Sequence, residues 1–155
     1  NTTRVVLGGP RPATTILKQF YSKVFPNAEI IKTDSTIAEM VKYLTNSFLA
    51  VKVSFANEIY TICNSLNIDY DKVIEYALHD ERLGRSHWSV PGPDGHMGFG
   101  GSCFPKDLNA LMHLAQELCI KANTIQGAWN TNLLARPEKD WEQLKGRAVV
   151  DENIG

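Results

Sequence analysis

A thiol, an ammonium group and a carboxylate lie close together in the stretch GFGGSCFPKD, residues 98–107. Pro105 is typical of the first position of a helix, which would place Cys103 just outside the helix N-terminus. The free N–H groups and the dipole at that end favour a thiolate, and Lys106 could add to this effect. Asp107 would fall in the first helical turn, where a carboxylate can manage a water molecule or a proton during a covalent cycle. The pattern is compatible with a nucleophilic Cys103.

A purely structural explanation of the same stretch stays open. Most cysteines are small buried apolar residues, and glycine-rich loops most often only turn the chain. Gly98, Gly100 and Gly101 would nevertheless let the backbone approach a ligand closely. Cys63 and Cys119 lie within helical patterns, so we interpret them as structural.

The composition argues against several classes of protein. The 155 residues carry a net charge of -1 with scattered basic residues, which argues against a nucleic-acid binder. No apolar stretch approaches the roughly 20 residues of a membrane helix. The three cysteines lack the spacing of a metal site, and reduced thiols fit the cytoplasm best.

The first part of the chain has the order of an α/β domain. Residues 4–9 and 28–33 are predicted strands, and residues 14–25 between them have helical spacing. This strand–helix–strand unit is too short for a domain, and the chain starts without Met. We therefore expect a fragment, whose opening is the tail of a sheet with its earlier strands missing.

A long helix is predicted next, because no Gly or Pro occurs from Ser35 to about Leu66. Thr36 and Glu39 match a capping box at its start. The helix is apolar on most sides and must be covered on nearly all of them, so a partner subunit is expected. Lys42 and Asn46 would lie on one face, about 6 Å apart, as a possible oxyanion site, although each alone could be an ordinary polar residue.

Shorter helices and one long loop complete the prediction. Asp69 or Asp71 can cap the first of these helices, and the glycine-rich loop has a length often associated with function. The expected segments are a helix over 69–80, the loop over 84–101, helices over 105–120 and 122–135, and then a short helix with a possible strand within 136–150.

GFGGSCFPKD closely resembles the catalytic-cysteine motif of the UDP-glucose/GDP-mannose dehydrogenase family. AEMVKYLTNSFLAVKVSFANE (38–58) resembles the interdomain helix of that family, ERLG (81–84) its arginine-containing turn, and NTTRVVLGG the end of its nucleotide-binding domain. The resemblance runs in order over roughly residues 1–136.

The resemblance implies a mainly α fold with three parts. Residues 1–33 would be the C-terminal tail of a Rossmann-type, NAD-binding α/β domain. Residues 34–136 would be the central helical dimerisation and catalytic-cysteine domain, built on one long helix. Residues 137–155 would be a linker or the start of a missing nucleotide-binding domain.

The implied activity is a two-step, NAD-dependent oxidation of a nucleotide-sugar C6 alcohol to an acid in the cytoplasm. Cys103 would form a thiohemiacetal and then a thioester, which water hydrolyses. Lys42 and Asp107 would manage that water and its protons, and Lys42 with Asn46 would hold the oxyanion.

The resemblance also implies the binding residues and the partners. Arg82 would reach the sugar, often from the partner subunit of a homodimer, and Lys106 would contact the cofactor. Phe99, Gly100, Gly101 and Phe104 would line the substrate. NAD would be bound mainly by a missing domain, because G-x-G-x-x-G is absent here, so this chain alone should be inactive. No metal is implied.

Three alternatives remain from the sequence. The substrate could be UDP-glucose, GDP-mannose or a UDP-N-acetyl sugar. The chain could instead be a non-catalytic dimerisation module of the same family. A Cys–His hydrolase would need His96 or His113 to reach Cys103.

Overall fold

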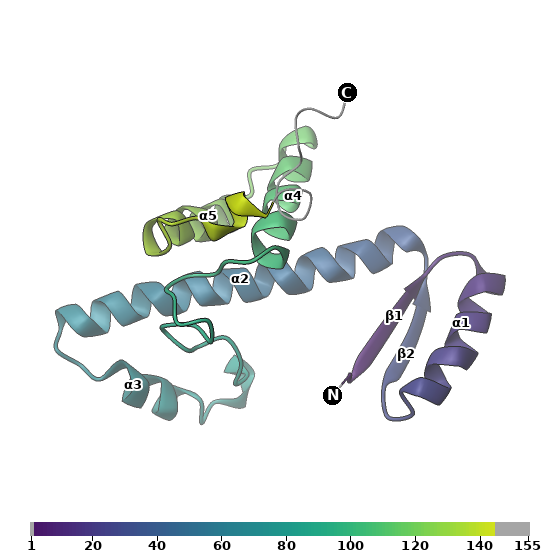
Figure 1. Ribbon diagram of the computed structural model, residues 1–155, viewed down its shortest axis with the longest axis horizontal. Helices are drawn as coiled ribbons and strands as arrows, with labels where there is room; N and C mark the ends of the chain where they lie inside the picture. Colours follow the sequence, from purple (N-terminus) through teal and green to yellow (C-terminus); the bar gives the residue numbers. More distant parts are fainter. Residues whose placement is uncertain (1, 145–155) are drawn as a thin grey trace. The chain divides into compact units, whose positions relative to one another are not determined.

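The computed structural model describes residues 2–144 (Figure 1). The chain divides into two compact units, one up to Thr45 and one from Asn46 onward. This boundary falls within a single long helix, α2 (Ser35–Ser65). The domain limits implied by the resemblance stay predictions.

The first unit contains a parallel two-stranded sheet, the helix that connects its strands, and the start of α2. Strand β1 (Arg4–Gly8) pairs with β2 (Glu29–Thr33), and α1 (Arg11–Val24) connects them. Helix α1 begins three residues before the stretch with helical spacing, because Pro12 fits the first turn of a helix, where N–H groups lack partners. The predicted strand–helix–strand order is confirmed.

Helix α2 has the predicted extent to within one residue, but the predicted capping box is wrong. The Asp34 carboxylate accepts the backbone N–H of Ile37 at 2.9 Å, so Asp34 caps the helix and Thr36 lies inside it. The other end closes with Asn67 in the left-handed conformation, at φ 54°. The N–H of Ile68 then bonds the carbonyl of Cys63 at 2.9 Å, which satisfies one of the last carbonyl groups of the helix.

The second unit is helical in its described part. It holds the rest of α2, α3 (Tyr70–Ala77), α4 (Cys103–Glu117) and α5 (Asn123–Ala135), with short 3₁₀ helices η1 (Glu81–Leu83) and η2 (Asp140–Gln143). Asp69 caps α3 by accepting the N–H groups of Asp71 and Lys72. The strand predicted after residue 144 lies outside the described residues.

The start of α4 differs from the prediction. The helix begins at Cys103, two residues before Pro105. Proline is tolerated throughout the first turn, because none of the N–H groups there has a partner inside the helix. Cys103 is therefore the first helical residue, and Asp107 lies one full turn beyond it.

Two apolar clusters form the core of the second unit. Phe99 and Leu108 pack with Ala50 of α2, which joins the glycine-rich loop to α2 and α4. Cys63 lies in the other cluster with Tyr70 and is buried, as its structural interpretation requires. The glycine-rich loop thus packs against α2 and α4 through the buried side chain of Phe99.

Candidate active site

Asp107 is the centre of the candidate site. Its side chain is completely buried, and its Oδ2 accepts a hydrogen bond from Asn46 Nδ2 at 2.5 Å. The neighbouring Lys106 ammonium forms an ion pair with its Oδ1. Figure 1 shows the N-terminal end of α4 next to α2, which is where this contact joins the two helices. The contacts compensate a buried carboxylate with one cation and one amide.

Cys103 is exposed at the first position of α4, and its Sγ lies 3.9 Å from Ser102 Oγ. Residues four apart lie on the same face of a helix, so Cys103 and Asp107 share one face of α4. The arrangement offers an accessible thiol beside free helix N–H groups, with a fixed carboxylate one turn away. These are the parts that covalent catalysis with a positioned water requires.

Lys42 belongs to the first unit and lies one helical turn before Asn46 in α2. It is exposed, and its ammonium is 5.9 Å from the centre of the Tyr43 ring. The other three predicted catalytic residues, Asn46, Cys103 and Asp107, belong to the second unit.

The glycine-rich loop before Cys103 is held by two buried asparagines. Asn132 of α5 accepts the N–H of Phe99 at 2.7 Å and donates to its carbonyl at 3.0 Å. Asn57 of α2 accepts the N–H of Gly98 at 3.0 Å. Sequence reasoning missed both residues, because their partners are backbone groups more than 30 positions away.

The close approach permitted by the glycines is to this chain's own side chains. A Cβ on Gly98, which has φ +67°, would collide with Asn132. A Cβ on Gly100 would collide with the guanidinium of Arg136 and the carboxylate of Asp140. Gly101 also has a positive φ, +68°, with open space around its Cβ position. Close packing against side chains of this chain thus requires glycine at positions 98 and 100, and the approach of a ligand to the loop stays a prediction.

A cavity of about 490 Å³ lies beside the loop. Phe99, Gly100 and Phe104, all predicted to line the substrate, contribute to its wall with His87 and Val53. The centre of the His87 ring lies 5.7 Å from that of the Phe104 ring. The Nδ1 atom of His87 is buried without a hydrogen-bond partner. Burial and the charge of Lys52 lower the pKa of His87. Sequence reasoning assigned His87 only to a loop.

Arg82 lies in η1, and its side chain is 88% exposed. Its guanidinium pairs with Asp80 at 2.6 Å, which lowers the pKa of Asp80 and raises that of Arg82. Lys52 holds this turn, because its ammonium donates to the carbonyls of Leu83 and Gly84 at 2.8 and 2.9 Å. Sequence reasoning missed Lys52, although a lysine in an apolar stretch of α2 was a visible signal.

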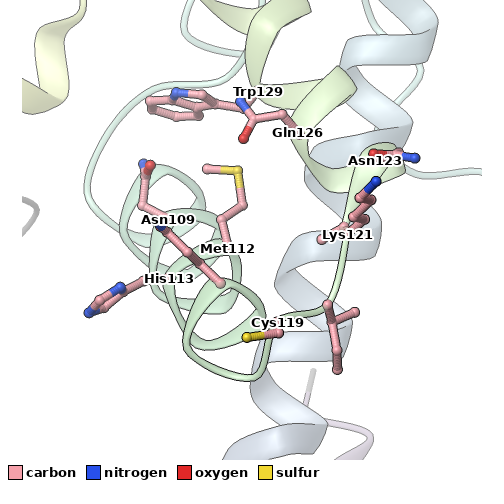
Figure 2. A pocket seen from close by; sticks show the side chains of 11 residues that line it. Asn109, Met112, His113, Cys119, Lys121, Asn123, Gln126 and Trp129 are labelled. Carbon is pink, nitrogen blue, oxygen red and sulfur yellow. The ribbon is translucent and has the colours of Figure 1, made fainter.

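A second hollow, of about 670 Å³, lies between the end of α4 and the start of α5 (Figure 2). Figure 2 shows Met112 and Gln126 pointing toward each other near the Trp129 ring, whereas His113 points away. His113 pairs with Glu117 at 3.7 Å, and His96 pairs with Glu138 at 3.0 Å. The partner of each of these two histidines is thus a glutamate.

Residues 2–144 lack two further kinds of site, a cluster of metal ligands and a membrane-spanning helix. This part of the chain contains no group of three or more His, Cys, Asp or Glu side chains placed to hold a metal ion. Its helices include none whose length and apolar character would let it span a bilayer.

Comparison with known proteins identifies the family. The central-domain model of the UDP-glucose/GDP-mannose dehydrogenase family matches residues 36–133. UDP-glucose 6-dehydrogenase YwqF of Bacillus subtilis is 41% identical over 152 residues, which cover 97% of this chain and 28% of that protein. The GDP-mannose 6-dehydrogenase of Pseudomonas savastanoi is 36% identical over 118 residues, 76% of this chain and 26% of the relative.

A solved structure agrees with the sequence relatives. The UDP-glucose dehydrogenase of Pyrobaculum islandicum superposes with a TM-score of 0.77 at 33% identity, over 91% of this chain and 31% of that one. The chain thus spans about three tenths of the length of the proteins it matches. Its mainly helical fold with a small parallel sheet is the predicted fold class. On these grounds the chain belongs to the UDP-glucose/GDP-mannose dehydrogenase family.

Proposed function

We propose that this chain is the cysteine-bearing part of a longer NAD-dependent nucleotide-sugar 6-dehydrogenase. The observation that carries the proposal is the accessible Cys103 at the start of α4, one turn before the buried and paired Asp107. UDP-glucose is the first candidate substrate, because several relatives are UDP-glucose 6-dehydrogenases. GDP-mannose is the second candidate, since other relatives are named for it.

The proposed covalent cycle uses Cys103 as nucleophile. The C6 alcohol first loses a hydride from its carbon and a proton from its hydroxyl group and becomes the aldehyde. The thiolate adds to the aldehyde carbon, and the oxygen takes up a proton, which gives a thiohemiacetal. Loss of a hydride from that carbon and of the proton from its hydroxyl group gives a thioester. Water then attacks the thioester carbonyl, the carbon–sulfur bond breaks, and the acid leaves with the thiolate restored. NAD, when bound, accepts the hydride in each of the two oxidations.

Asp107, Asn46 and Lys42 have separate roles in this proposal. Asp107 takes the proton of the attacking water, because its carboxylate is fixed by Asn46 and Lys106. An amide has two N–H groups, so Asn46 can hold Asp107 with one and donate the other to the oxyanion. Lys42 supplies a positive charge one turn away on the same helix.

The binding surfaces are proposed on the same basis. Phe99, Gly100 and Phe104 line the cavity beside the loop, which supports a role in holding the sugar, together with Gly101. Arg82 is exposed, which supports the proposed contact with a substrate bound in a partner subunit. The parallel β1–α1–β2 unit fits part of a dinucleotide-binding domain, and Lys106 is the residue of this chain proposed to contact NAD. All three thiols are free, which fits a cytoplasmic location.

The test is NADH formation by the complete protein that contains this chain, with UDP-glucose and with GDP-mannose. Replacing the nucleophile in Cys103→Ser should lower kcat by at least about 10³-fold. Cys119→Ser is the matched control, because Cys119 is an exposed thiol at the opposite end of α4. Undiminished activity of Cys103→Ser would refute the mechanism. A native protein that binds neither NAD nor nucleotide sugar would favour the non-catalytic dimerisation module.

A further inference from the structure

A buried arginine, Arg136, follows α5 and is hydrogen-bonded to Asp94 of the glycine-rich loop. The Arg136 side chain is only 4% exposed, although it is charged. Its Nη1 donates to Asp94 Oδ2 at 2.7 Å, and its Nε donates to Asp140 Oδ1 at 2.7 Å. Burying a guanidinium is costly unless it is paired and hydrogen-bonded, so these two carboxylates are required for its position.

The second carboxylate oxygen of Asp140 is bonded to the loop itself. Asp140 Oδ2 accepts the backbone N–H of Gly101 at 2.9 Å. Gly101 lies two residues before Cys103, with one residue separating it from α4. Asp94, at the other end of the contact chain, lies earlier in the same loop. Arg136 and Asp140 therefore join two points of the loop to the segment that follows α5.

Gly100 of the loop also packs closely against Arg136 and Asp140. A Cβ on Gly100 would collide with both the Arg136 guanidinium and the Asp140 carboxylate. Burial acts to raise the pKa values of Asp94 and Asp140, but the Arg136 guanidinium and backbone N–H groups outweigh it and lower both. Both carboxylates are thus ionised near neutral pH and remain paired with Arg136.

We propose that Arg136 and Asp140 are positioning residues for Cys103. Together with Asp94 they form a clamp, Asp94–Arg136–Asp140–Gly101, that fixes the backbone directly before α4 and thereby the place of the thiol. Neither side chain needs to contact the substrate. The inference rests on the proposed function, because it assigns a purpose to the position of the nucleophile.

The first measurement is the kinetics of Asp140→Ala in the complete protein. Loss of the Gly101 contact should lower kcat by about 10-fold to 100-fold, because a small misplacement of a reacting group is costly. The KM for the nucleotide sugar should change less than about threefold, since uniform binding is not removed. Asp140→Asn keeps an oxygen acceptor for Gly101 and should recover part of the loss.

Glu138→Ala is the matched control. Glu138 is a half-exposed acidic neighbour, 3.9 Å from Arg136 Nε, but its carboxylate pairs mainly with His96. Its removal should leave kcat unchanged. Equal losses in Glu138→Ala and Asp140→Ala would show a general charge effect and overturn the clamp.

The second measurement works on the chain without turnover. The alkylation rate of Cys103 by iodoacetamide is divided by that of Cys119 in the same molecule, with the product resolved by peptide mass. Asp140→Ala and Arg136→Lys should change this ratio at least about threefold, because only one of the two thiols lies beside the clamp. Circular dichroism confirms that each variant is folded before the ratio is read.

The two proposals fail in different ways. An unchanged alkylation ratio with unchanged kcat in a folded Asp140→Ala protein overturns the clamp and leaves the proposed function intact. Absence of NADH formation by the native protein overturns the proposed function, whatever the ratio is. Should Asp140→Ala not fold, Asp140→Asn and Arg136→Lys give the same comparison.

Discussion

At the scale of single residues, His87 is a titratable side chain in the wall of the cavity beside the glycine-rich loop. Its Nδ1 is buried without a partner, and its ring packs against Phe104. Burial, followed by the charge of Lys52, lowers its pKa below the ordinary value. In the folded chain the imidazole therefore stays neutral to a lower pH than in the unfolded chain.

This depression predicts the direction of a pH effect on stability. In the unfolded chain His87 has a pKa of about 6.5, so below that pH it binds a proton there more readily than in the folded chain. The free energy of unfolding therefore falls as the pH falls. His87→Asn should remove this contribution and tolerate the φ of 68° at that position. Urea unfolding of the native chain and of His87→Asn at pH 7.5 and 5.5 measures the difference.

His79→Asn provides the control for this comparison, because His79 is exposed. The native chain should lose more stability than His87→Asn between the two pH values, while His79→Asn follows the native chain. Identical pH dependence of the native chain and His87→Asn would contradict the prediction.

Side-chain roles were predictable where the partners are close in sequence. Cys103 and Asp107 are four residues apart, so any helix through them places both on one face. Asn132 and Arg136 gave no such signal, because Asn132 bonds the backbone of Phe99 and Arg136 bonds the carboxylate of Asp94, each more than 30 positions earlier in the sequence. No periodicity in the sequence marks a side chain whose partner is a distant peptide group.

At the scale of the elements, α4 ends in an arrangement that usually contains glycine. Cys119 has φ 57°, its N–H bonds the carbonyl of Gln116 at 3.0 Å, and the N–H of Ile120 bonds that of Ala115 at 2.8 Å. This is a Schellman motif with cysteine at the left-handed position. The prediction that the helix continues to residue 120 fails, because a cysteine gives no warning of such a turn.

The motif predicts a stabilising substitution. Left-handed backbone costs a residue with a Cβ roughly 1 kcal/mol, a cost that glycine avoids. Cys119→Gly should therefore raise the free energy of unfolding by about 0.5–1 kcal/mol, after the greater freedom of glycine in the unfolded chain is subtracted. Thermal unfolding followed by circular dichroism measures it.

Cys119→Ala separates backbone strain from the loss of the thiol. Alanine keeps the Cβ, so this variant should have the stability of the native chain to within about 0.5 kcal/mol. A gain in Cys119→Ala equal to that in Cys119→Gly would show that the thiol, and not the backbone, sets the effect.

The extent of α2 was more predictable than the residue that caps it. The run without Gly or Pro predicts α2 to within one residue, because nothing in it interrupts the backbone hydrogen bonds. Its start was assigned to Thr36 because a capping-box pattern is present, but the carboxylate of Asp34 lies nearer to the free N–H groups. Competing polar side chains at a helix start are distinguished only by the path of the chain before them.

At the scale of the whole molecule, the part of α2 in the second unit exposes a stripe of large apolar side chains. Phe48, Phe55 and Ile62 are 64%, 50% and 53% exposed and follow one another at seven-residue intervals. Seven residues are nearly two full helical turns, so the three side chains form one line along the helix. Such a line is typical of a surface that another subunit covers.

The proposed homodimer through α2 predicts an oligomeric state that this stripe controls. Phe48→Glu combined with Ile62→Glu places two charges where the partner would pack, so the double variant should be monomeric at micromolar concentration while the native chain is a dimer. Sedimentation velocity measures both. Phe55 is left unchanged because its ring packs edge-on against Trp88 of the same unit, with 6.3 Å between the ring centres. The unfolding temperature of the native dimer should also rise with chain concentration, and that of the double variant should not.

Leu118→Glu is the control for this experiment, because Leu118 is 60% exposed at the C-terminal end of α4 and is not part of the stripe. A charge there should leave the dimer intact, since the interface proposed here runs along α2. A native chain that sediments as a monomer would contradict the proposed homodimer. Dissociation by Leu118→Glu but not by the double variant would move the interface to the end of α4, and the apolar stripe of α2 would then need another covering surface.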